Sequence, residues 1–96
     1  MEISHVDNGT KGRFFVSVDN VELAAMTYVW SGTDKIIIDH TEVDPILKGQ
    51  GVGNKLLASL VAWVREKNIK VIPLCPFVKA VFDKNADYQD VLYHAG

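Results

Sequence analysis

The sequence has one cysteine, no cluster of basic residues and no long apolar run, and each absence excludes a class of protein. A single cysteine cannot form an internal disulfide, which fits a reducing compartment. With a net charge of −2, the chain lacks the clustered positive face of nucleic-acid-binding domains. Its longest apolar stretch, residues 56–64, is interrupted by Ser59 and is far shorter than the ~20 residues of a membrane-spanning helix.

The amino-terminal region is polar and has no apolar segment of the kind found in secretory signal peptides. We therefore expect the protein in the cytoplasm. Its 96 residues, 48% hydrophobic and 23% charged, are typical of one soluble domain with its own core. We expect a single domain over residues 1–96 that is a monomer and binds neither nucleic acid nor a membrane.

The first half of the chain is rich in β-branched and aromatic residues and predicts an antiparallel meander. We expect strands over residues 14–18, 21–30 and 35–43, with a short strand over residues 3–6 before them. Asp19 and Asn20 form the first tight turn between these strands, because both residue types tolerate left-handed backbone angles. Residues 31–34 form the next turn.

The second half predicts a helix between the meander and one more strand. Apolar residues recur there at steps of three and four and form one stripe: Val52, Leu56, Leu57, Leu60, Val61 and Val64. Asn68 is expected to end this helix in a left-handed conformation. A strand over residues 70–75 and a helix over residues 77–84, with Pro76 in its first turn, should follow. Residues 88–92 fit either a helix or a strand.

This order of elements predicts the fold class. A strand, a crossover helix and another strand form a parallel pair with a right-handed connection. We therefore expect an α/β (α+β) fold with a mixed sheet, in which an antiparallel meander is followed by a glycine turn, a helix, a parallel strand and a helix.

A glycine-rich turn, residues 48–53, lies directly before the first helix. The first N–H groups of a helix lack internal partners, and glycines let an anion approach the backbone closely. The turn therefore predicts a phosphate site, although glycines also serve simply to make tight loops. The P-loop and Rossmann patterns are both excluded, because each requires a further glycine at a position that holds Asn54 or Leu56.

Residues 43–57 resemble motif A of the GNAT superfamily, the acetyl-CoA-dependent N-acetyltransferases. That motif reads Q/R-x-x-G-x-G/A, follows a strand that ends in V-x-P and precedes an amphipathic helix. Gly51 and Gly53 match its two small positions. Lys48 stands at the Q/R position, where it keeps a cation but loses the planar fork of arginine. The resemblance covers residues 35–82 and extends to a short single-domain subgroup with His-Thr-Glu-Val before the turn and Leu-Cys-Pro-Phe after the helix.

The resemblance implies that acetyl-CoA is the cofactor and that an amine is the acceptor. The backbone amides of residues 48–54 would hold the pyrophosphate of CoA, and residues 41–43 would line its pantetheine arm. The end of the later strand would face the thioester. The cofactor-binding residues that this implies are Thr41, Glu42, Val43, Lys48, Gly49, Gln50, Gly51, Val52, Gly53, Asn54, Cys75 and Pro76. No spacing of residues suggests a metal site.

Three side chains are candidates for catalysis. Cys75 could protonate the departing CoA thiolate or act as a nucleophile, although an unpaired cysteine is as often a small buried apolar side chain. His40 could be a general base because imidazole titrates near neutral pH, or it could be a hydrogen-bonded sheet residue. Glu42 shares a strand face with His40 by alternation and could be a base, orient His40 or be a solvated charge. His5 and His94 suggest no specific role.

Two departures from longer family members bear on activity. Phe82 stands where many of those enzymes have a tyrosine that protonates the thiolate, so the proton must come from another group. Only a tight turn follows residues 14–18, where longer members have two helices that wall the acceptor site. An open acceptor side suggests a large acceptor such as a protein amine, a partner chain, or no acceptor. The alternatives are a non-catalytic protein that binds or senses acyl-CoA, and an interaction module on the same fold.

Overall fold

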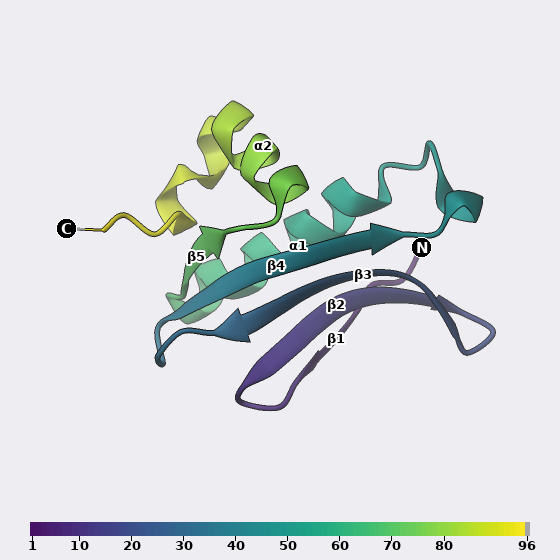
Figure 1. Ribbon diagram of the computed structural model, residues 1–96, viewed down its shortest axis with the longest axis horizontal. Coiled ribbons are helices and arrows are strands. Elements are labelled where there is room, and N and C mark those ends of the chain that lie inside the picture. The colour runs from purple at the N-terminus through teal and green to yellow at the C-terminus, as the bar shows by residue number, and fades with distance from the viewer. Residues whose placement is uncertain (96) are drawn as a thin grey trace.

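A computed structural model of the chain describes residues 1–95 as a five-stranded sheet with helices packed against it (Figure 1). The strands lie in sequence order, β1 to β5. β1 to β4 are antiparallel neighbours, and β4 and β5 are parallel. The elements are β1 (Ser4–Asp7), β2 (Lys11–Val18), β3 (Val21–Trp30), β4 (Lys35–Val43), η1 (Pro45–Leu47), α1 (Val52–Lys67), β5 (Lys70–Pro73), α2 (Pro76–Lys84) and η2 (Ala86–Val91). The predicted fold class is confirmed.

The turn and cap residues have the backbone angles that the sequence predicts. Asp19 and Asn20 join β2 to β3 with φ values of 52° and 66°. Asn68 ends α1 with a φ of 58°, and its N–H donates to the carbonyls of Arg65 and Val64. These residues set the length of the meander and the point at which α1 turns back to β5.

One face of the sheet carries the hydrophobic core, because α1 lies across it. All six residues of the predicted helix stripe are buried. They pack against inward side chains of the strands: Phe14, Val16, Ala24, Met26, Tyr28, Ile36, Ile38 and Val71. The alternate residues on the other face, such as Phe15, Thr27 and Ile37, are only half-buried. Within residues 1–95, no helix covers this second face, which we call the open face.

The predicted bounds differ from the structure at several element ends; β1, for example, covers Ser4–Asp7 rather than residues 3–6. β2 begins at Lys11, because it pairs with β3 as far as Val29. β5 ends at Pro73, because the N–H groups of Leu74 and Cys75 both donate to the Ile38 carbonyl and the chain turns into α2. Residues 45–47, for which the sequence predicted no element, form the 3-10 helix η1. Within residues 1–95, neither α-helix is long and apolar enough to cross a membrane.

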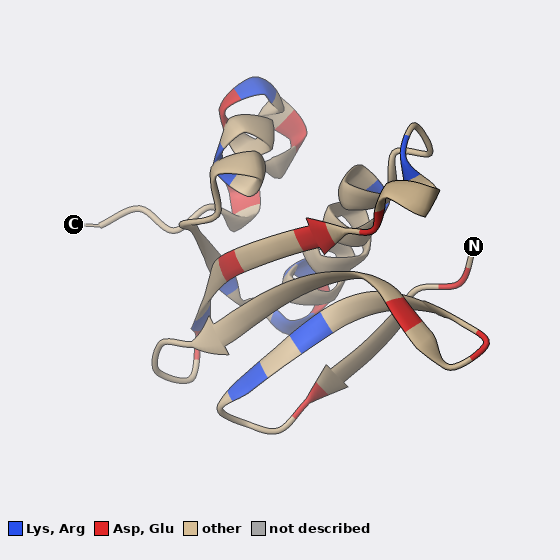
Figure 2. Cartoon of the chain, turned by 45° about the vertical axis from the view of Figure 1, so that its right-hand side comes forward, with Lys and Arg blue, Asp and Glu red and all other residues tan. Residues whose placement is uncertain are grey.

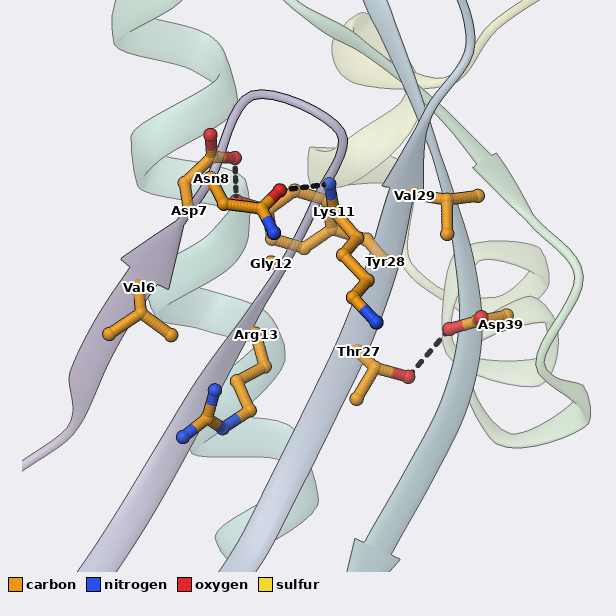
Figure 3. A pocket seen from close by; sticks show the side chains of 10 residues that line it. All are labelled: Val6, Asp7, Asn8, Lys11, Gly12, Arg13, Thr27, Tyr28, Val29 and Asp39. Carbon is orange, nitrogen blue, oxygen red and sulfur yellow. Dashed lines mark hydrogen bonds between the residues drawn. The ribbon is translucent and has the colours of Figure 1, made fainter.

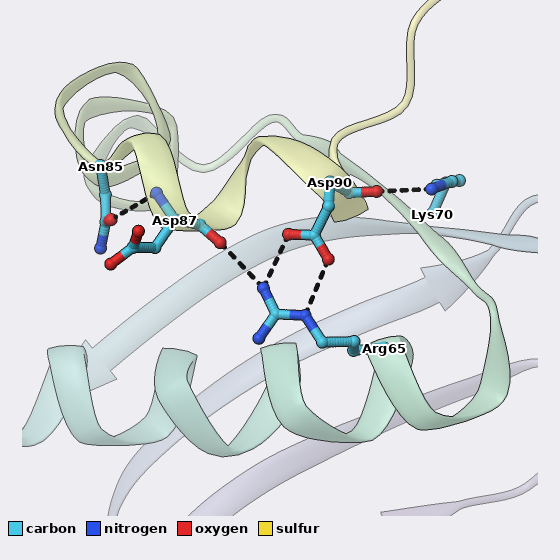
Figure 4. A network of polar contacts seen from close by, with 5 residues as sticks. All are labelled: Arg65, Lys70, Asn85, Asp87 and Asp90. Carbon is cyan, nitrogen blue, oxygen red and sulfur yellow. Dashed lines mark hydrogen bonds and ion pairs between the residues drawn. The ribbon is translucent and has the colours of Figure 1, made fainter.

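Residues 88–92, which the sequence left between helix and strand, belong mostly to the 3-10 helix η2. Leu92 then forms a parallel bridge with Val71, and the Tyr93 N–H donates to the Val71 carbonyl. Arg65 of α1 fixes η2 in place through two hydrogen bonds of 2.7 Å to the Asp90 carboxylate and one of 2.8 Å to the Asp87 carbonyl (Figure 4). The hydrogen bonds between them lower the pKa of Asp90 and raise that of Arg65. The carboxyl-terminal segment therefore covers the outer edge of β5.

Two features of β4 position the site. Its pairing with β5 ends at Ile38, opposite Pro73, whereas β4 itself continues to Val43. The two strands therefore part after Ile38 and leave a split between them. The pairing of β4 with β3 shifts at the same place, because His40 lies opposite Thr27 and Ile38 lies opposite Tyr28. Asp39 is thus the extra residue of a β-bulge.

Candidate cofactor and acetyl-transfer site

The glycine turn is held in shape by its own backbone and by one carboxylate. Asp44 caps η1, since its side chain accepts the Ile46 N–H at 3.0 Å. The N–H groups of Lys48 and Gln50 donate to carbonyls of η1. Gly49 and Gly51 have φ values of 84° and 66°, in the left-handed region that glycine adopts without strain. These contacts hold the turn in one defined conformation.

The amino terminus of α1 is open to a ligand. Gly51 is its N-cap residue, so no side chain caps the helix, and its first turn contains no acidic residue. The first intrahelical bond runs from the Lys55 N–H to the Gly51 carbonyl at 3.0 Å. The N–H groups before Lys55 and the helix dipole together favour an anion here. A Cβ atom built at Gly49 or Gly51 would meet no heavy atom within 4 Å, so an anion has room to approach the backbone here.

A shallow hollow of about 430 Å³ lies beside this turn. It is lined by the end of β4, by η1 and by the turn: Val43, Asp44, Pro45, Leu47, Lys48, Gly49, Gly51 and Val52. Lys48, Gln50 and Asn54 are exposed around it. The structure thus brings the predicted pyrophosphate-binding residues together at one end of the split, and the free N–H groups in the first turn of α1 fit the phosphates of CoA.

Gly53 has a different role from the other two glycines of the motif. A Cβ atom there would lie 2.9 Å from the ring of Phe77, which is 38% exposed. The absence of a side chain at Gly53 lets α2 approach the first turn of α1. Phe77 therefore forms an aromatic wall beside the open helix terminus.

Cys75 lies at the inner end of the split. Its thiol is buried, with 5% of the residue exposed, and donates to the Thr41 hydroxyl at 3.3 Å. Its N–H donates to the Ile38 carbonyl at 3.0 Å, and the exposed Pro76 begins α2 directly after it. The structure therefore joins Cys75 to Thr41 across the two separating strands.

His40 and Glu42 lie on the other side of the sheet from Cys75. They are exposed and pair with Thr27 and Ala25, which belong to the open face. Thr41, the partner of Cys75, pairs with Met26 on the core face. The structure therefore places His40 and Glu42 on one strand face, as expected, but it does not bring either of them to Cys75.

Phe82, at the position of the tyrosine in longer enzymes, is 1% exposed and packs against Tyr88 with 5.7 Å between ring centroids. It is a core residue with no polar group to offer. Among the described residues, no group of three His, Cys, Asp or Glu side chains is placed to hold a metal ion.

Sequence reasoning missed a polar cluster around His5. The His5 Nε2 atom lies 2.7 Å from the Tyr28 hydroxyl, which donates to Asp7 at 2.5 Å, and the Trp30 indole donates to the same carboxylate at 2.8 Å. The His5 ring stacks on Phe14 with 3.9 Å between centroids. Period-two alternation places His5 and Asp7 on one strand face, which was the available signal. This cluster supports the sheet and lies away from the glycine turn.

Comparison with known proteins agrees with this geometry. A family profile described as GCN5-related N-acetyl-transferase matches residues 13–91. The chain is similar to a Staphylococcus aureus protein described as a GCN5-like N-acetyltransferase, with a TM-score of 0.74 and 40% identity over 99% of this chain and 90% of that one. No match is found among curated protein sequences.

More distant enzymes share the fold. The ribosomal-protein-S18-alanine N-acetyltransferase of Escherichia coli has a TM-score of 0.65 and 16% identity over 81% of this chain and 53% of its own. A GNAT family acetyltransferase from Elizabethkingia anophelis, solved with acetyl-CoA bound, has a TM-score of 0.56 and 15% identity over 67% of this chain and 42% of its own. Together with the profile match, the 40% identity shows that this chain belongs to the GCN5-related N-acetyltransferases, a family of acyltransferases that use acetyl-CoA.

Proposed function

We propose that the protein transfers the acetyl group of acetyl-CoA to an amine that approaches from the open face of the sheet. The observation that carries this proposal is the uncapped amino terminus of α1 beside the hollow at residues 43–52. Free amides, a helix dipole and two left-handed glycines without neighbours form an anion site that the fold itself does not use.

The split between β4 and β5 suits the pantetheine arm. Within the described chain, the part of β4 after Ile38 has no β5 residue beside it, so its backbone groups on that side are free to bond an amide-containing ligand. Thr41, Glu42 and Val43 lie along this part of β4. An arm bound there would run from the glycine turn to Cys75.

In the reaction, the acceptor nitrogen forms a bond to the thioester carbonyl carbon, the C–S bond breaks, and the nitrogen loses a proton while the thiolate gains one. We assign the second proton to Cys75, because its thiol is at the end of the split and Phe82 cannot donate. We assign the first proton to His40, because it is exposed on the face from which the acceptor approaches. Glu42, next but one along the same face, would act beside His40 as a second proton acceptor or as a negative charge that orients it.

The buried state of Cys75 favours one alternative. A thiol that is 5% exposed and already bonded to Thr41 could be a packing residue. The protein would then bind or sense acyl-CoA without turnover. The uncapped helix terminus supports both functions equally, so the distinction depends on chemistry.

Incubation of the protein with acetyl-CoA, followed by intact-mass measurement and an assay of free CoA, tests the proposal. The incubation should be repeated with small amines and with a lysine-containing peptide, because the open face admits a large acceptor. Release of CoA only when an amine is present, together with an acetylated product, is expected. Binding of acetyl-CoA without CoA release for any amine would establish the sensing function instead, and absence of binding would exclude both.

A further inference from the structure

A second hollow, of about 490 Å³, lies on the open face, and neither the glycine turn nor the split accounts for it (Figure 3). It is formed by the end of β1, the start of β2, the middle of β3 and one residue of β4. Its lining residues that matter here are Asn8, Lys11, Arg13, Thr27 and Asp39. The hollow therefore spans four strands, and charged and polar side chains stand in a lining that also includes Val6 and Val29.

Opposite charges face each other across this hollow. The basic residues Lys11 and Arg13 are on β2, whereas Asp39 is on β4, and the same separation is visible along the sheet in Figure 2. Arg13 is already engaged by Glu22, at 2.8 Å and 3.1 Å. Within residues 1–95, the Lys11 ammonium and the Asp39 carboxylate have no oppositely charged partner within 4.0 Å. Asp7 also lines the hollow, but its carboxylate already accepts hydrogen bonds from Gly9, Tyr28 and Trp30. Lys11 and Asp39 thus remain as the cation and the anion that a ligand can pair with.

The two charges are held by ordered backbone. The Asn8 side chain accepts the N–H groups of Thr10 and Lys11, each at 2.9 Å, which fixes the turn where β2 begins. On the other side, the Thr27 hydroxyl donates to Asp39 at 2.6 Å and orients its carboxylate over the open face. β2 and β4 lie two strand spacings apart, roughly 10 Å between their axes. The Lys11 side chain extends from β2 toward Thr27 and Asp39 (Figure 3), and its ammonium is more than 4.0 Å from the Asp39 carboxylate, so a small molecule can contact both groups.

Asp39 also lies close along the chain to the place proposed for acetyl transfer. It directly follows Ile38, the last residue of β4 that pairs with β5, whose carbonyl accepts the Cys75 N–H. His40, the next residue, pairs with Thr27 of the same hollow. A group held at Asp39 is therefore beside the inner end of the split and next to the proposed proton acceptor.

We propose that this hollow binds the acceptor as a zwitterion, with its ammonium group at Asp39 and an anionic group at Lys11. The inference rests on the proposed acetyl transfer and names its acceptor class: an amine that carries a carboxylate a short distance away. Such a group occurs in a free amino acid and in a peptide whose amine lies near a carboxylate. The bound ammonium loses one proton to solvent before its nitrogen attacks, and the nitrogen gives a second proton to His40 as the amide forms, so Asp39 orients the acceptor and takes no proton itself.

Amide NMR titrations of the whole protein, with and without CoA, test the inference separately from turnover. The probes are glycine, β-alanine, 4-aminobutyrate and 6-aminohexanoate, which differ only in charge separation. Butylamine and butyrate each lack one of the two charges. A short lysine-containing peptide represents an acceptor amine that belongs to a protein. Chemical-shift changes are expected at residues 8–13, Thr27 and Asp39. One of the four amino acids, the one whose charge separation matches the hollow, should bind at least tenfold more tightly than butylamine or butyrate.

The variants Asp39→Asn and Lys11→Met should each lower the affinity for the tightest-binding probe by about tenfold. They should also raise KM for that probe more than they lower kcat. Asp39→Asn keeps an acceptor for the Thr27 hydroxyl. The controls Asp34→Asn and Lys67→Gln change the same charges at exposed positions outside the hollow and should leave binding unchanged. If the peptide binds more tightly than the free amino acids, the natural acceptor is a protein or peptide amine.

Two results would overturn the inference: no shift at these residues with any probe, or equal affinity in Asp39→Asn, Lys11→Met and the wild type. If CoA is released with butylamine as readily as with the zwitterions, acetyl transfer stands and this acceptor class is wrong. If the zwitterions bind here but no amine causes CoA release, the hollow stands as a binding site and the proposed transfer is wrong.

Discussion

Tyr28 donates its hydroxyl proton to Asp7, with 2.5 Å between the two oxygen atoms, and it does so across β2. Asp7 and Tyr28 both lie opposite Gly12, one on each neighbouring strand. Because the Tyr28 proton is given to Asp7, the imidazole of His5 must donate its Nε2–H to the Tyr28 oxygen. These bonds connect β1 to β3, which are not neighbours in the sheet.

This network predicts that the protein loses stability in mild acid. Burial lowers the pKa of His5 below its ordinary value of 6.5, and the negative charge of Asp7 offsets this only in part. The unfolded chain then binds the proton more readily than the folded one. The contribution of His5 to the free energy of unfolding should therefore be complete above about pH 6.5 and should decrease as the pH falls below that value.

Asp7 adds a second, more acidic step. Burial raises the pKa of its carboxyl, but hydrogen bonds from Tyr28, Gly9 and Trp30 and the charge of His5 together hold it below the ordinary 3.8. Its contribution should be present above pH 3.8 and lost as the pH falls further. Urea unfolding from pH 7.5 to pH 3 measures both steps. His5→Gln should remove the first step, whereas the exposed His94→Gln should not; an unchanged first step in His5→Gln would contradict the assignment.

Gly12 is predicted to be intolerant of even one methyl group. A Cβ atom there would lie 2.5 Å from the Val6 carbonyl oxygen and closer still to the Tyr28 hydroxyl. Gly12→Ala should therefore destabilise the protein by about 1–3 kcal/mol, since both neighbours must move and the Tyr28–Asp7 bond is displaced. Ser17→Ala, at an exposed position of the same strand, is the matched control, because its side chain is not packed against a neighbouring strand. Equal urea midpoints for the two variants would exclude this steric explanation.

Much of the fold could be predicted from short patterns whose physics is local. Asp19 and Asn20 tolerate the left-handed turn, Asn68 ends a helix, and the stripe of α1 needs only a 3.6-residue period. The early start of β2 could not be predicted this way. Lys11 and Gly12 are weak strand formers, and they are extended because β3 continues far enough to pair with them.

The face on which His40 lies shows why the site was harder to predict. Ile36 and Ile38 are buried on the core face, so strict alternation would place His40 there too. The bulge at Asp39 shifts the pattern by one residue, and His40 faces the open side while Thr41 meets Cys75. The glycine turn was visible because its residues are contiguous. The hollow between Lys11 and Asp39 was not, because strand register alone brings those residues together.

Gly51 is predicted to control cofactor binding. Valine at this position would place a branched side chain in the open space above the α1 terminus, so Gly51→Val should weaken acetyl-CoA by at least tenfold in calorimetry. Its φ of 66° also strains a β-branched residue, at a cost of about 1–2 kcal/mol in stability. Gly32→Val imposes similar strain at a φ of 78° in the turn between β3 and β4. If Gly32→Val weakens binding as much, the effect is not local to the turn.

Lys48 is predicted to contribute a screened charge to cofactor affinity. It is exposed at the rim of the turn, so Lys48→Ala should weaken acetyl-CoA about two- to fivefold at low salt, as expected for a solvent-exposed ion pair. The loss should shrink as the salt concentration rises, because the Debye length falls to about 3 Å at 1 M. Lys67→Ala, at the opposite end of α1, serves as the control. A penalty that stays constant from low to high salt would show that Lys48 does not act through the phosphates.

The role of Cys75 can be resolved by comparing two variants of Cys75 with one variant of its hydrogen-bond partner Thr41. If its thiol protonates the departing thiolate, Cys75→Ser should retain acetyl-CoA affinity and lose most turnover, because a serine hydroxyl is a far weaker acid. Thr41 would still offer the serine a hydrogen-bond partner, which favours a folded variant. If Cys75 is instead a nucleophile, the wild type incubated with acetyl-CoA should gain about 42 Da in mass, the acetyl group of a thioester.

Thr41→Val separates position from chemistry, because it removes the 3.3 Å contact but keeps the thiol. Under either catalytic role, this variant should keep measurable turnover that Cys75→Ser lacks. Cys75→Ala completes the comparison by removing the sulfur from a site that is 5% exposed. If Cys75→Ala retains full turnover with an acceptor known to be acetylated, Cys75 contributes only to packing. The CoA thiolate would then take its proton from solvent that enters the split.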